Sequence, residues 1–155
     1  MKSIPELLHE YETRLLKDKL LEFPGLIRRK KDELSQARRQ LSEAQNARTE
    51  AEALLVSIIA TEINPNTGKP AYSNAEARAA ELINRKKQSA EYQQAEKICR
   101  DIEAQVNSLQ FDLERLQDEF KSYRYVVDLT ARELALMASD HQGGGNGRNE
   151  ERQPY

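Results

Sequence analysis

The chain has 155 residues, about the length of one domain. An apolar fraction of 38%, a charged fraction of 32% and the absence of tryptophan exclude a thick globular core and favour an elongated helical protein. The net charge of -2 provides no overall attraction to nucleic acid or to an anionic membrane.

The first predicted helix spans residues 4–62. It begins at Ser3-Ile4-Pro5-Glu6, which has the pattern of a capping box with proline in the first turn. Its apolar seam advances in steps of four and three residues: Leu16, Leu20, Phe23, Ile27, Lys30, Leu34, Ala37, Leu41, Ala44, Arg48, Ala51, Leu55 and Ile58. Pro24-Gly25 interrupts the helix, and the pattern leaves open whether Pro24 kinks it or breaks it in two.

A polar segment, 63–73, follows and contains Gly68-Lys69. A phosphate-binding loop requires a preceding strand, a glycine five residues earlier, and Ser or Thr after the lysine. Here those positions hold Ile63 and Pro70, and no strand precedes them. We therefore predict a connection in which Gly68 takes a positive φ and Ser73-Asn74-Ala75-Glu76 caps the next helix. Whether this turn also serves as a recognition tip stays open.

The second predicted helix spans residues 74–138, and neither glycine nor proline occurs between Pro70 and Gly143. Its seam is longer than the three or four heptads that are needed to predict a coiled coil. The seam positions are Tyr92, Ala95, Cys99, Ile102, Val106, Leu109, Leu113, Leu116, Phe120, Tyr123, Val127, Thr130, Leu134 and Met137.

Together these features predict an all-α fold, a long antiparallel coiled-coil hairpin forming one domain over residues 1–138. Equal helix lengths would pair residue i with about residue 136 minus i. Residues 139–155 are rich in glycine and polar residues and predict a disordered tail.

Large apolar residues also occur away from both seams, near the end that carries the termini. A two-helix seam cannot bury them, so we expect a second copy of the chain to cover them, with a dimer favoured. A fold-back of residues 4–22 at Pro24-Gly25 is the alternative. The predicted self-association residues are Tyr11, Leu15, Leu21, Phe111, Tyr125 and Leu129.

A basic stretch offers a second functional interpretation, an accessory protein that contacts nucleic acid through phosphate groups. The residues are Arg28, Arg29, Lys30, Lys31, Arg38 and Arg39. The competing interpretation is a solvated flank that is compensated by acidic residues of the partner helix.

No motif predicts catalysis, a metal site or a cofactor. Glu6-Leu7-Leu8-His9 has the spacing used in di-iron bundles, but those sites need a second such motif and two more carboxylates. Cys99 is the only cysteine, which excludes an intramolecular disulfide. The longest apolar stretch, residues 53–60, is too short to span a bilayer. We expect a soluble, cytoplasmic protein that is not an enzyme.

The stretch "TEINPNTGKPAYSNAEARAAEL", followed by "EYQQAEK", resembles short helical coiled-coil proteins of unknown role from bacteriophages and prophages. The shared pattern is a turn with Gly-Lys, an aromatic-Ser-Asn cap and a charged helix, over about residues 60–100. The resemblance implies a bacterial or phage setting and an interaction or scaffold role, with no reaction.

Overall fold

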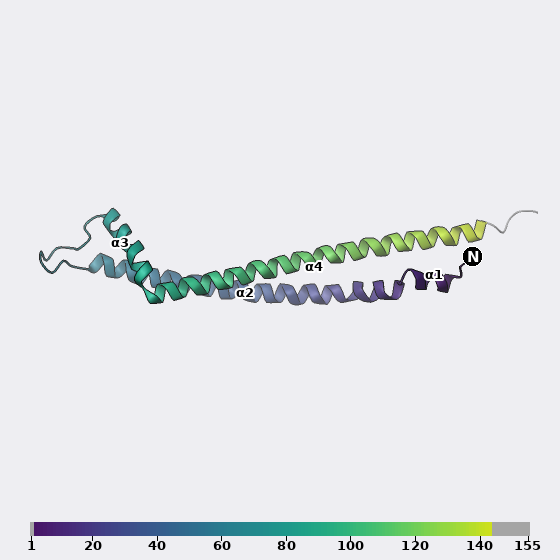
Figure 1. The fold of residues 1–155 in the computed structure, drawn as a ribbon, viewed down its shortest axis with the longest axis horizontal. Helices are drawn as coiled ribbons and strands as arrows, with labels where there is room; N and C mark the ends of the chain where they lie inside the picture. Colours follow the sequence, from purple (N-terminus) through teal and green to yellow (C-terminus); the bar gives the residue numbers. More distant parts are fainter. Residues whose placement is uncertain (1, 144–155) are drawn as a thin grey trace, which may run out of the picture. The chain divides into compact units, whose positions relative to one another are not determined.

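The structure is a computed structural model that describes residues 2–143, with side chains described through residue 140. Four helices account for most of this range: α1 (Ile4–Glu10), α2 (Thr13–Thr61), α3 (Ala75–Gln88) and α4 (Ala90–Gly143) (Figure 1). The predicted all-α class is confirmed. The chain divides into two compact units, a terminal unit (Met1–Arg28 and Glu114–Tyr155) and a loop unit (Arg29–Leu113).

The first predicted helix is interrupted near its start. Glu12 adopts a φ of +48°, a conformation that costs L-residues free energy, and so separates α1 from α2. The Thr13 hydroxyl donates to the Leu8 carbonyl and satisfies one end-of-helix acceptor. At the other end of α1, the backbone N–H of Ser3 donates to Glu6 Oε2 at 2.6 Å, as a capping box requires.

Helix α2 continues through Pro24. The predicted alternative of a true break at Pro24-Gly25, with residues 4–22 folding back, is therefore wrong. Phe23 explains why the helix tolerates the proline: the residue is 5% exposed, and its ring packs against Phe120 and Tyr123, with centroids 5.7 and 5.2 Å away. Burial of this aromatic cluster offsets the hydrogen bond that Pro24 cannot make.

Helices α2 and α4 pack against each other along the predicted seams. Every seam residue between Leu16 and Leu55, and between Tyr92 and Leu134, is buried or half-buried. The prediction fails at the end of α2, where Ile59 is 2% exposed and Ile58 is 51% exposed. The seam shifts by one residue there because α3, rather than α4, is the partner of this last turn.

The predicted register is also wrong. It places Arg48 opposite Gln88, yet Arg48 bonds to Glu96, about two helical turns further along. In the terminal unit, Phe23 lies against Phe120 rather than residue 113. In each unit the contacts still run antiparallel. The error arises because the prediction treated residues 74–138 as one continuous helix.

Ser89 divides that helix into α3 and α4. Its φ of -76° and ψ of 112° end α3, while its hydroxyl accepts from the Tyr92 N–H and begins α4. As a result α3 is steeply inclined to α4 within the loop unit (Figure 1). A sequence signal existed, since Ser89 followed by Glu91 is a common helix start.

The connection between α2 and α3 is closed by backbone hydrogen bonds. The N–H groups of Asn64 and Ala71 donate to the carbonyls of Lys69 and Glu62, at 2.8 and 2.9 Å. Gly68 has the predicted positive φ, +65°. The cap of α3 is Asn74 rather than Ser73, because the Asn74 side chain accepts from the Ala77 N–H at 2.7 Å.

Helix α4 extends to Gly143, five residues beyond the predicted end. Part of the predicted tail, residues 139–143, is therefore helical. The remainder, residues 144–155, lies outside the described residues.

Candidate interaction surfaces

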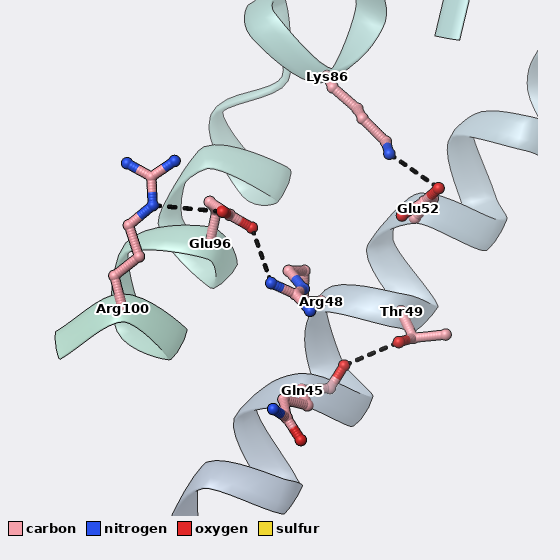
Figure 2. Close-up of polar contacts among 7 residues, drawn as sticks. All are labelled: Gln45, Arg48, Thr49, Glu52, Lys86, Glu96 and Arg100. Carbon is pink, nitrogen blue, oxygen red and sulfur yellow. Dashed lines mark hydrogen bonds and ion pairs between the residues drawn. The ribbon is translucent and has the colours of Figure 1, made fainter. Parts of the chain in front are cut away.

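A polar corner joins α2, α3 and α4 within the loop unit (Figure 2). Arg48 Nη1 on α2 lies 3.2 Å from Glu96 Oε2 on α4. The other oxygen of Glu96 accepts from Arg100 Nε at 3.3 Å, so one carboxylate serves two guanidinium groups. The hydrogen bond to Glu96 raises the pKa of Arg48. This contact fixes the register of α2 against the start of α4.

A second contact of this corner holds α3 against α2. Lys86 Nζ lies 2.8 Å from Glu52 Oε1 and 5.2 Å from the centre of the Tyr92 ring (Figure 2 shows the ion pair). The hydrogen bond to Glu52 raises the pKa of Lys86. Lys86 thus bridges the last turn of α3, the α2 helix and the first turn of α4.

Arg85 makes the third contact. Its guanidinium donates to Glu81 within α3, at 2.6 Å, and to Glu62, the residue that follows α2, at 2.7 Å. The hydrogen bond from Arg85 lowers the pKa of Glu81, and Tyr72 contributes in the same direction. The pKa of Arg85 is correspondingly raised. The positive charge of Arg85 thus lies between the carboxylates of Glu62 and Glu81 and compensates them.

An apolar groove of about 310 Å³ lies between the end of α2 and the first half of α3. Its walls follow helical spacing on both sides, and Arg78 is its one charged lining residue. The lining residues are Val56, Ile59, Ala60, Ala75, Arg78, Ala79 and Leu82. The sequence analysis did not predict this groove. The available signal was the three alanines, whose small side chains allow two helices to lie close together without filling the space between them.

The predicted self-association residues of the terminal unit are largely uncovered in the single chain. Tyr125 and Leu129 on α4, and Leu15 and Leu21 on α2, are all exposed. Tyr125, Leu129 and Leu136 each follow a seam residue by two positions, which places them about 200° around α4, on its outer face. We call these three residues the outer stripe.

Two predicted members differ from the rest. Tyr11 is half-buried, and the hydrogen bond from its hydroxyl to the Glu133 carboxylate raises the pKa of Tyr11. Phe111 is 69% exposed but belongs to the loop unit. The structure therefore brings together only part of the predicted set, and self-association itself stays a prediction.

The basic residues of the alternative interpretation are mostly exposed. Arg28 belongs to the terminal unit; Arg29, Lys31 and Arg39 are exposed in the loop unit. Lys30 pairs with Glu33 at 2.9 Å, and Arg38 donates to Gln110 at 2.9 Å. Two of the six are thus engaged within the chain. Nucleic-acid contact stays a prediction.

Cys99, a seam residue of α4, is 3% exposed and therefore packed in the core. Among residues 2–143, no group of His, Cys, Asp and Glu is arranged to hold a metal ion. None of the helices in this range is long and apolar enough to cross a membrane.

Comparison of the chain with protein-family models, curated proteins and solved structures found no match. The resemblance to phage and prophage proteins is therefore unsupported by these comparisons and stays a prediction.

Proposed function

We propose that this chain is a non-enzymatic, coiled-coil interaction protein that self-associates through the outer stripe. The observation that supports the proposal is the exposure of Tyr125, Leu129 and Leu136 on one face of α4, at 66%, 41% and 67%. A soluble helix normally exposes polar residues on the side opposite its packed seam. Three large apolar residues in line there indicate a surface that is covered in the functional state.

Self-association covers the outer stripe of one chain with the apolar residues of a second copy. Burying one large apolar side chain contributes roughly 1.5–3 kcal/mol, so a stripe contributed by each of two chains stabilises an assembly appreciably. Two-fold pairing is the commonest arrangement for identical chains, because each stripe then packs on its own counterpart. Leu15 on α2 is a further exposed apolar residue of the same unit.

Sedimentation equilibrium of the full chain tests this proposal. We expect a dimer at tens of micromolar, and we expect Leu129→Glu and Leu136→Glu to shift the protein to monomer with helicity retained by circular dichroism. Leu54→Glu is the matched control, since Leu54 is a 56% exposed leucine of the loop unit. A monomeric unmodified chain, or equal effects of all three substitutions, contradicts the proposal.

A further inference from the structure

The apolar groove between α2 and α3 remains open in the single chain. Val56 is 47% exposed beside it, while Ile59 at its base is 2% exposed. Ala60, Ala75 and Ala79 have no side chain beyond Cβ and cannot fill the space between the helices. The volume of about 310 Å³ compares with roughly 150 Å³ for a cavity that holds benzene, so the groove accommodates about two large side chains.

The charge at the groove has one sign. Arg78 is exposed, and its Nε contacts the Asn74 carbonyl at 3.4 Å. The nearby carboxylates of Glu52, Glu62 and Glu81 are bonded to Lys86 and Arg85. Glu76 precedes Arg78 by two residues and therefore points to another side of α3. The groove thus presents an apolar floor beside a cation.

We propose that this groove binds an amphipathic helix of another protein that carries two apolar anchor residues and an adjacent carboxylate. Two packed helices with a gap between them favour a third helix, because its apolar face can lie along both walls. The apolar anchors occupy the space above Ala60 and Ala79, and the carboxylate pairs with the Arg78 guanidinium. The surface belongs to the loop unit and involves no residue of the outer stripe.

A pair of synthetic peptides tests the proposal with the full chain. Both are fluorescein-labelled amphipathic helices with leucines at positions i, i+3, i+4 and i+7; one has glutamates beside the leucines and the other has lysines. Fluorescence anisotropy is expected to show the glutamate peptide binding at least tenfold more tightly than the lysine peptide. Absence of binding up to about 1 mM, or equal binding of both peptides, overturns the proposal.

Substitutions then locate the binding. Ala79→Trp fills the groove and is expected to weaken binding of the glutamate peptide at least tenfold, whereas Ala80→Trp, one residue away and outside the groove lining, leaves it unchanged. Arg78→Glu should reverse the preference toward the lysine peptide, and Lys87→Glu at the far end of α3 should not. Circular dichroism of each variant excludes loss of fold. Binding that survives Ala79→Trp and Arg78→Glu overturns the proposal.

Binding should also persist in the Leu129→Glu variant. That result separates this site from self-association, because the groove and the outer stripe share no residue.

Discussion

Charged side chains hold α3 in its place together with the burial of Ile59 of α2 beside it. Helix α3 contains no buried residue, and its connection to the rest of the loop unit includes Arg85 with Glu62 and Lys86 with Glu52. Ion pairs near a protein surface contribute modestly, up to about 1 kcal/mol each. The position of α3, and with it the groove, therefore depends on a few residues whose charge state matters.

Glu81→Gln tests that dependence through pH. The hydrogen bond from Arg85 lowers the folded pKa of Glu81, so its stabilising contribution is fully present above the ordinary pKa of 4.5 and is lost as the pH falls through the lowered folded pKa. We expect a higher urea midpoint for the unmodified chain than for Glu81→Gln at pH 7, and convergence of the two midpoints once the pH has fallen through the lowered pKa of Glu81. Circular dichroism at fixed protein concentration provides the measurement.

The matched control is Glu103→Gln, at an exposed position of α4. Its urea midpoint should follow that of the unmodified chain at every pH. A Glu81→Gln difference that does not shrink as the pH is lowered contradicts the assigned role of Arg85.

At the scale of elements, helix boundaries follow local chemistry in some places and tertiary contacts in others. Asn74 and Ser89 begin helices with side-chain caps, and Gly68 provides the positive φ of the turn. Pro24, the strongest helix breaker in the first half, nevertheless lies inside α2. Packing of Phe23 against α4 outweighs the local preference there.

Pro24→Ala should therefore stabilise the protein. The substitution restores the backbone N–H that can bond to the Leu20 carbonyl and removes the ring clash, and we expect a gain of about 1–3 kcal/mol. Urea denaturation monitored by circular dichroism gives the value. Gly25→Ala is the companion variant, because Gly25 is helical with open space around its Cβ position; it should gain about 0.5–1 kcal/mol. A loss of stability in Pro24→Ala would show that the packing of Phe23 requires the proline.

At the scale of the whole molecule, the two units differ in how much they bury. The loop unit buries Leu34, Ala37, Ala44, Ala51, Ile59, Cys99 and Leu113, whereas the terminal unit buries Phe23 and Thr130. The Thr130 hydroxyl donates to the Val126 carbonyl within its own helix, which allows a polar residue at this seam position. Low burial predicts low local stability and a greater need for a partner.

Hydrogen exchange measured by mass spectrometry tests this difference. We expect α1 to exchange fastest, since it is a helix of only 7 residues, none of them buried, and the segments of α2 and α4 around Ala44 and Cys99 to exchange slowest. Leu129→Glu should accelerate exchange in the terminal unit and leave the loop unit unchanged. Equal protection of both units in the unmodified and substituted chains contradicts both the burial difference and the proposed assembly.

The heptad spacing by itself determined that the chain is all-α and which faces of α2 and α4 are packed, because periodic apolar residues leave a helix one low-energy way to bury them. Gly68 and the turn residues likewise predicted the connection between α2 and α3, since their conformations are local. The continuation through Pro24, the shift from Ile58 to Ile59 and the register of Arg48 against Glu96 were decided only by the tertiary structure. Each depends on contacts between residues distant in sequence, and a one-dimensional pattern contains no information about which turn of one helix meets which turn of another.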